Sequence, residues 1–189
     1  MRLQTKEEIK SWLDKYNVKN YTINSDLTVD VMGNVFLSDK SLNEIPFKFG
    51  NVRGNFWCND NQLTGLEFSP KEVRGSFYCH FNKLTSLEFS PEVVFDHIDY
   101  SSNKLTSLEF ITGKIGGDFY CENNQLNTLL YIPWEIDGKI YLENNPLLEK
   151  HQYINSFEDL VVASKLYKLE EDLRSNLSIN TEKTNKIKV

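Results

Sequence analysis

A glycine recurs every 21 residues through the middle of this chain, and an aspartate takes its place once. The positions are Gly33, Gly54, Gly75, Asp96, Gly117 and Gly138. The residues that follow also repeat, so that Asn-Phe-Trp-Cys after Gly54 returns as Ser-Phe-Tyr-Cys after Gly75. A fixed period in this range indicates a solenoid, in which each coil buries its apolar face only by stacking on its neighbours. Such a fold usually offers a binding surface rather than a pocket for chemistry.

Apolar residues occupy fixed columns within the repeat. Phe56 and Cys58 are two positions apart, a spacing typical of a β-strand that turns both residues to one side. The other columns predicted to face inward are those of Leu63, Leu66, Phe68 and Val73. Six stacked parallel strands are therefore expected near residues 34–38, 55–59, 76–80, 97–101, 118–122 and 139–143, with little helix between 33 and 145.

An asparagine stands between the cysteine column and the first leucine column of each repeat. The members are Asn61, Asn82, Asn103, Asn124 and Asn145. A buried polar side chain has to be paired, and a stacked amide can bond backbone groups of its own coil and of the adjacent one. We therefore predict a structural asparagine ladder inside the solenoid.

The three cysteines share one column with leucine and tyrosine. Cys58, Cys79 and Cys121 occupy this position in three repeats, and Leu37, Tyr100 and Leu142 occupy it in the other three. A position that accepts leucine is an apolar core position, where free cysteine behaves as a small hydrophobic residue. Buried free thiols are therefore expected in preference to a disulfide or a metal site, because the cysteine count is odd and the spacing of metal ligands is missing.

Charge and hydropathy limit the classes of partner. The net charge of −6 argues against nucleic acid, which needs a cationic footprint, and favours a basic protein surface. No run approaches the ~18 apolar residues of a membrane span, and the charged N-terminus is unlike a signal peptide. Together with the expected free thiols, which need a reducing compartment, this composition predicts a cytoplasmic protein. A monomer is expected in preference to a dimer.

Both flanks of the repeats are predicted to be caps. Thr5 and Glu8 form a capping-box motif before a helix over 5–17, and a hairpin is expected over 21–31. A second helix is expected to start at 156–159. The predicted organisation is a cap over 1–32, six repeats over 33–150, a helix over 151–174 and a polar, disordered tail over 175–189.

The second helix carries an apolar stripe. Its members are Val162, Leu166, Leu169 and Leu173. The simplest interpretation is that this stripe covers the last coil, and the alternative is a short coiled coil with a second copy. The number of heptads is too small to favour the alternative.

The repeat resembles a known family. The pattern Phe56-x-Cys58-x-x-Asn61-x-Leu63-x-x-Leu66 is similar to the leucine-rich-repeat signature, and the prolines that follow resemble the compact bacterial type with an extended convex side. The sequence Asn-Lys-Leu-Thr-Ser-Leu-Glu within the repeat and the N-terminal segment over 12–31 resemble leucine-rich-repeat proteins of tailed bacteriophages. The resemblance covers about residues 5–150. It implies a mainly β solenoid with one parallel sheet and α-helical caps, in the host cytoplasm, and it implies no activity.

An outward-facing row runs along the predicted strands. It consists of Phe36, Trp57, Tyr78, Asp99, Tyr120 and Tyr141. Strands about 4.8 Å apart would bring these side chains into a near-continuous ladder on the concave face. Trp and Tyr are enriched at interface hot spots, so the row is a candidate protein-binding surface, although stacked rings can also stabilise a sheet without any ligand.

The break in that row contains the only cluster of catalytic type. His80, His97, Asp99 and Asp118 are expected on the same face. An imidazole beside a carboxylate can support acid–base catalysis or metal binding, but no nucleophile motif, third histidine or pocket accompanies this cluster. We expect a hydrated polar break, with no catalytic residue, metal or cofactor, and we count His80 and His97 with the outward row as candidate partner-binding residues. The predicted function is therefore a non-catalytic protein-binding module, and the alternative is a structural or glycan-binding component of a virion or adhesin.

Overall fold

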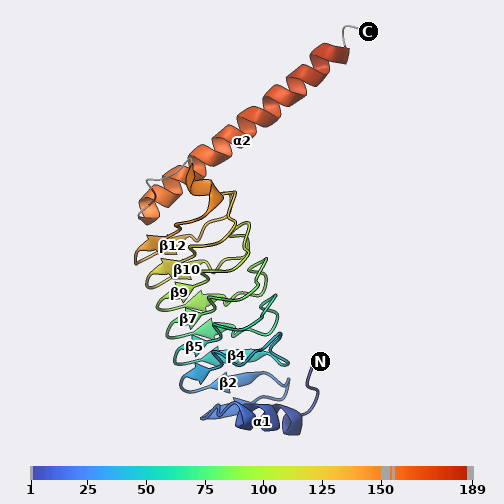
Figure 1. Cartoon of the computed structure of the whole chain (residues 1–189), viewed down its shortest axis with the longest axis vertical. Coiled ribbons are helices and arrows are strands. Elements are labelled where there is room, and N and C mark those ends of the chain that lie inside the picture. The colour runs from blue at the N-terminus through green and yellow to red at the C-terminus, as the bar shows by residue number, and fades with distance from the viewer. Residues whose placement is uncertain (1, 150–153, 155, 187–189) are drawn as a thin grey trace.

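The chain winds into a stack of coils with a helix at either end (Figure 1). The computed structural model describes residues 2–149, 154 and 156–186. Helix α1, Lys6–Lys15, lies against the first coil, and helix α2, Phe157–Lys186, extends away from the last one (Figure 1). Neither of these helices is both long and apolar enough to cross a bilayer in the part of the chain described.

One sheet consists of six strands of two residues each, and all its pairings are parallel. The strands are β3 (Val35–Phe36), β5 (Phe56–Trp57), β7 (Phe77–Tyr78), β9 (Ile98–Asp99), β11 (Phe119–Tyr120) and β13 (Ile140–Tyr141). Each strand pairs with its counterpart one repeat away, as Phe56 does with Phe77. The six parallel strands predicted from the 21-residue period are confirmed. We call this the β3–β13 sheet.

A second sheet covers the opposite side of the coils, where the sequence predicted only extended chain. Its strands are β1 (Tyr21–Ile23), β2 (Val29–Val31), β4 (Phe49–Val52), β6 (Glu72–Val73), β8 (Val93–Val94), β10 (Lys114–Ile115) and β12 (Glu135–Ile136). The β1–β2 hairpin is antiparallel and the other pairings are parallel. The same 21-residue period brings these extended segments into register, and their backbone groups then bond to each other. The solenoid therefore has two sheets instead of the single one expected.

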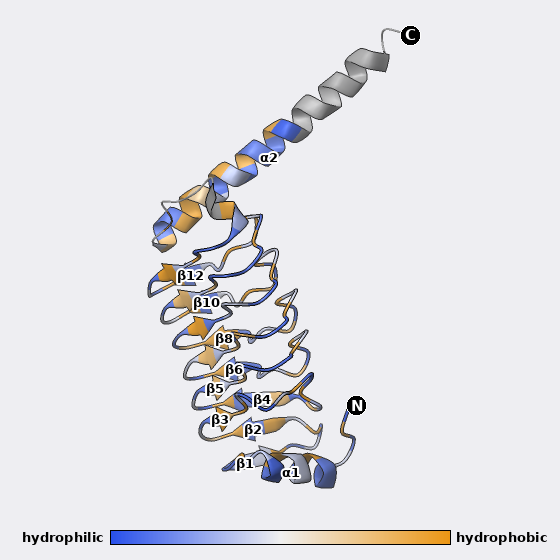
Figure 2. Ribbon diagram, in the orientation of Figure 1, coloured by the Kyte–Doolittle hydropathy of each residue, from blue (hydrophilic) through white to orange (hydrophobic). Residues whose placement is uncertain are grey.

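The core lies between the two sheets, where the columns of Phe56, Cys58, Leu63, Leu66 and Val73 are buried. Figure 2 shows the strands mostly in hydrophobic colours and the loops mostly in hydrophilic ones. The three cysteines are free and buried, as expected. Burial raises the pKa of the Cys58 and Cys121 thiols, so neither is a reactive thiolate at neutral pH.

One column predicted to be inward is not. Phe47 is buried, but its counterparts Phe89 and Phe110 are each 56% exposed, and Tyr131 is 47% exposed. The reason lies two residues further on, where a separate column of Pro70, Pro91, Thr112 and Pro133 occupies the interior. The aromatic side chains are displaced outward, and Phe89 and Phe110 take left-handed φ values of 65° and 66°.

The five asparagines form a continuous hydrogen-bonded column inside the solenoid. In Asn82 the amide nitrogen donates to the carbonyl oxygens of Cys58, at 3.0 Å, and Cys79, at 3.1 Å. Its amide oxygen accepts a 3.0 Å bond from the backbone N–H of Leu63 in the preceding coil. The same three contacts recur at Asn61, Asn103, Asn124 and Asn145.

The recurring glycine is explained by a second column of side chains at the start of each strand. The Asn55 amide oxygen accepts a 2.8 Å bond from the backbone N–H of Ser76. A Cβ atom added to Gly75 would lie 1.9 Å from that oxygen, so any larger residue would displace the Asn55 amide from its bond with Ser76. In the next coil the column holds the smaller Ser76, whose hydroxyl donates to the Asp96 carboxylate at 2.9 Å. The one replacement of glycine by aspartate therefore coincides with a replacement of asparagine by serine.

The N-terminal cap forms much as the sequence suggests. Thr5 is the N-cap of α1 and its side chain accepts from the backbone N–H of Glu8, while the Glu8 carboxylate accepts from Thr5, which completes a capping box. Ile9 and Leu13 are buried against the first coil. The helix of ten residues is shorter than the predicted 5–17.

The C-terminal helix covers the last coil with a different face from the one predicted. Leu160 and Ala163 are fully buried, and the Ser164 hydroxyl donates to the Leu129 carbonyl at 2.6 Å. The stripe of Val162, Leu166, Leu169 and Leu173, expected to do this, is 46–56% exposed. The helix also continues to Lys186, past the predicted end at residue 174. Lys150, predicted to end the last repeat, lies outside the described residues.

Candidate functional site

The outward row of the β3–β13 sheet is set by the alternation of its strands. Val35 and Leu37 are buried, so Phe36 between them points outward, and the same alternation repeats in every coil. Phe36 is 59% exposed, whereas the other five members are half-buried. We call these six side chains the outer row: Phe36, Trp57, Tyr78, Asp99, Tyr120 and Tyr141.

The rings of the outer row stack on one another in two blocks. Phe36 and Trp57 have ring centroids 4.6 Å apart with an interplanar angle of 7°, and Trp57 and Tyr78 are 5.8 Å apart at 11°. In the second block Tyr120 and Tyr141 are 4.6 Å apart at 0°. This stacking explains the partial burial of the rings, because each inner ring covers the face of its neighbour.

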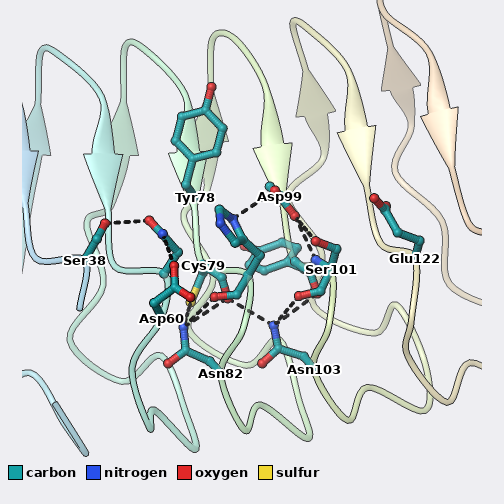
Figure 3. Close-up of polar contacts among 12 residues, drawn as sticks. Ser38, Asp60, Tyr78, Cys79, Asn82, Asp99, Ser101, Asn103 and Glu122 are labelled. Atoms are coloured by element: carbon teal, nitrogen blue, oxygen red, sulfur yellow. Dashed lines mark hydrogen bonds and ion pairs between the residues drawn. The ribbon is translucent and has the colours of Figure 1, made fainter. Parts of the chain in front are cut away.

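Asp99 separates the two blocks and is held by side chains on one side of the row (Figure 3). One carboxylate oxygen lies 2.9 Å from Nδ1 of His80, and the other accepts from the backbone N–H and the hydroxyl of Ser101, at 2.9 Å and 2.6 Å. Burial alone would raise the pKa of Asp99, but the bonds from His80 and Ser101 outweigh it and lower that pKa.

The imidazole of His80 is correspondingly easier to protonate. Burial opposes protonation, but the Asp99 carboxylate, with Asp60 and Glu122 farther away, raises the pKa of His80 above its usual value. His80 and Asp99 thus form a half-buried pair that is an ion pair when the imidazole is protonated.

Glu122 lies on the same side of the row, one coil beyond Ser101 (Figure 3). Its Oε2 atom is buried and has no hydrogen-bond partner among the described residues. Burial, together with the carboxylates of Asp99 and Glu143, raises the pKa of Glu122. The Glu122 side chain is therefore easier to protonate than an ordinary glutamate.

His97 and Asp118 belong to a different group on the other side of the row. The His97 Nδ1 atom accepts a 2.8 Å bond from the backbone N–H of Asp118, in the place that Asn55 fills two coils earlier. Asp118 in turn accepts from the backbone N–H of Lys139 at 2.7 Å and from the Tyr120 hydroxyl at 3.0 Å. Burial and the Asp118 carboxylate raise the pKa of Tyr120 to about 12.

The four residues expected to form one cluster are therefore divided into two. His80 pairs with Asp99, whereas His97 lies 3.4 Å from Asp96 and 3.7 Å from Asp118 and continues the column of side chains beside the glycines. Within the described residues, no group of three or more His, Cys, Asp and Glu side chains is placed to hold a metal ion.

Phe81 is part of this surface and was missed by the sequence analysis. It is 57% exposed, and its ring meets the His80 ring edge-on with centroids 5.6 Å apart. Its φ is +49°, a left-handed conformation that bulky residues rarely adopt. The equivalent turn positions hold Asp39, Asp60, Ser102, Asn123 and Asn144, all with positive φ. A phenylalanine among small polar residues was the available signal.

A pocket between two loops lies away from this surface. It has a volume of about 420 Å³ and is lined mainly by the loops over 40–45 and 63–69, with Tyr16 of the N-terminal cap region beside it. None of the predicted site residues lines it. Its charged groups, Lys40, Glu44 and Glu67, are not arranged as an acid–base pair with the histidines, which lie elsewhere.

Comparison with known proteins gave no identification. No protein-family model, curated protein or solved structure matches the chain significantly.

Proposed function

We propose that this chain is a non-catalytic protein-binding module that holds its partner on the outer face of the β3–β13 sheet. The observation that carries the proposal is the outer row itself, in which two blocks of aromatic rings flank the polar His80–Asp99 pair. Aromatic side chains next to a few oriented polar groups are the usual composition of an interface centre. The exposed Phe81, held in a left-handed conformation, adds a further apolar contact beside the pair.

The charge of this face favours a partner with basic side chains. Asp99, Asp118 and Glu122 lie on it, and Glu122 has an oxygen without a hydrogen-bond donor among the described residues. An Arg or Lys of the partner would supply that donor, and the net charge of −6 would assist its approach.

A glycan is a weaker candidate ligand for the same face. Sugar rings pack on the open faces of aromatic side chains, but here Trp57 is stacked between Phe36 and Tyr78. Mostly ring edges and hydroxyl groups are left for a ligand, which suits a protein surface better than a flat sugar. A structural role in a virion or adhesin remains the second hypothesis.

We further propose that the solenoid is of the leucine-rich-repeat class and that the protein acts in the cytoplasm, as an accessory factor of a bacteriophage in its host. The support is the resemblance of the repeat sequence, in which the strand, asparagine and leucine positions follow one another as in that family. The buried free thiols agree with a reducing compartment.

The test starts with a pull-down from bacterial lysate, and binding of the retained protein is then measured with single variants. Phe36→Ala is the sharpest one, because this ring is 59% exposed and stacks on Trp57 alone. Trp57→Ala and Tyr78→Ala test the centre of the same block. Each should weaken binding by about 1–3 kcal/mol, the range for hot-spot truncation.

The control variants are Glu67→Ala and Glu88→Ala, exposed residues outside the β3–β13 sheet. They should bind like the wild type. Trp57→Ala should also lower the unfolding free energy by about 0.5–1.5 kcal/mol, because it removes two stacking contacts. If the aromatic variants lose only stability and bind normally, the row is a structural ladder and the proposal is wrong. Retention of a purified oligosaccharide instead of a protein would favour the second hypothesis.

A further inference from the structure

The apolar stripe of α2 is exposed and is not covered by any part of the chain that the structure describes. Val162, Leu166, Leu169 and Leu173 succeed one another at intervals of four, three and four residues, so they lie on one face of the helix. Their exposed fractions are 52%, 46%, 56% and 54%. On the opposite face Leu160 and Ala163 are buried, and the hydroxyl groups of Ser164 and Tyr167 donate to the carbonyl oxygens of Leu129 and Asn127.

Covering the last coil therefore does not explain the stripe. A helix that only caps a solenoid needs one apolar face, and α2 already has one in Leu160 and Ala163, both fully buried. The alternating intervals of three and four are those of the a and d positions of a coiled coil. In that scheme Leu166 and Leu173 are a positions, and Val162 and Leu169 are d positions.

The charged residues beside the stripe indicate what covers it. Lys165 precedes an a position and is therefore a g position, and Glu170 follows a d position and is an e position. In a parallel pair of helices a g residue meets the e residue five positions later in the partner helix, which joins Lys165 to the partner's Glu170 and, by symmetry, the reverse. Neither residue forms an ion pair within the described part of the chain.

We propose that two copies of this chain associate through the stripe of α2, as a parallel two-stranded coiled coil. The helix extends away from the solenoid over most of its length (Figure 1), so a second helix can lie along it, and each solenoid stays on the outer side of its own helix. This arrangement departs from the monomer favoured by the sequence, in which the small number of heptads argued against a coiled coil. The reason for the change is that Leu160 and Ala163 are buried on another face of α2, which leaves the stripe exposed. It would place two partner-binding faces in one assembly.

Sedimentation equilibrium of the full chain at roughly 10–100 µM tests the association. The wild type should show a dimer of twice the 22.0 kDa chain mass. Leu166→Glu and Leu169→Glu should be monomeric at the same concentrations, because each places a charge in the seam. Both residues are exposed in the single chain, so the thermal melt of a monomeric variant should still show a folded solenoid. A wild type that is monomeric throughout this range overturns the proposal.

Charge exchange tests the parallel orientation. Lys165→Glu should weaken the dimer about tenfold, because the new carboxylate would lie opposite the Glu170 carboxylate of the other helix. Adding Glu170→Lys to this variant should restore the affinity. Lys168→Glu, an exposed change on the same helix but off the stripe, is the matched control and should have no comparable effect. An antiparallel pair would bring Lys165 beside the partner's Asp172. Restoration by Asp172→Lys instead of Glu170→Lys would therefore show that the parallel arrangement is wrong.

Discussion

The Nδ1 atom of His80 lies 2.9 Å from the Oδ2 atom of Asp99 in the next coil, so a titratable pair connects two neighbouring repeats. The pKa of His80 is raised in the folded chain and that of Asp99 is lowered. A raised histidine pKa stabilises the fold below the pKa of the unfolded chain, near the ordinary value of 6.5, and this stabilisation is lost as the pH rises through the folded value.

The first prediction is therefore a pH dependence of stability. The difference in unfolding free energy between the wild type and His80→Gln should be larger at about pH 6 than at about pH 8. The reason is that only the protonated imidazole attracts the Asp99 carboxylate. Urea unfolding at the two pH values measures the difference. His97→Gln is the control for the general effect of losing a histidine. An equal gap between wild type and His80→Gln at both pH values would show that the pair does not titrate in this range.

The second prediction concerns the asparagine column. Asn82→Ala should lower the unfolding free energy by about 1–3 kcal/mol, because it leaves the Leu63 N–H unpaired inside the solenoid and removes one of the two amide donors from each of the Cys58 and Cys79 carbonyl oxygens. Chemical denaturation measures the loss. Lys83→Ala, at the exposed next position, should change stability by less than about 0.5 kcal/mol. A neutral Asn82→Ala would mean that water reaches these backbone groups.

The third prediction concerns the glycine and its neighbour. Gly75→Ala should destabilise the chain by roughly 1–3 kcal/mol, the cost of forcing an extra carbon into a packed site, because its Cβ would lie 1.9 Å from the Asn55 amide oxygen. Adding Asn55→Ser should recover part of the loss, since serine is what accompanies Asp96 in the next coil. Gly65→Ala is the control, because no heavy atom lies within 4 Å of the added carbon there. Equal losses from the single and double variants would contradict the proposed coupling.

The fourth prediction concerns Phe81. Phe81→Asn should raise the unfolding free energy by about 1 kcal/mol, because asparagine tolerates the left-handed conformation better than phenylalanine. The reciprocal change Asn123→Phe, at the same turn of another coil, should lower it by a similar amount. Thermal or urea melts measure both effects. If the exposed ring contacts the partner, Phe81→Asn should at the same time weaken binding, so that stability and affinity change in opposite directions.

The sequence predicted the architecture well because the repeat leaves little choice of register. A constant spacing between Phe56 and Phe77 fixes which residues pair, and the confirmed β3–β13 sheet follows from that. The second sheet was not predicted, since Glu72–Val73 and Val93–Val94 are too short to stand out as strands and pair only because the coils are already aligned.

The site was less accessible to prediction, because it depends on contacts across coils. Alternation alone gave the outward direction of Trp57, but its partial burial comes from the rings of Phe36 and Tyr78. The division of the two histidines was also hidden, because His97 stands at a position where other coils use Asn or Asp as a hydrogen-bond acceptor. At α2 the leucine spacing marked a stripe correctly and could not tell which side the last coil would cover.

The match between Gly75 and Asn55, and between Asp96 and Ser76, limits how a chain of this kind can grow by gene duplication. Glycine opens the coils that follow Asn34, Asn55, His97 and Asp118 in this column, whereas Asp96 opens the coil that follows Ser76. Asp96 uses the space and the hydroxyl donor that Ser76 provides, so its coil keeps this contact only when it is copied together with the coil before it. Recombination would therefore propagate the glycine coils one at a time and the aspartate coil in pairs.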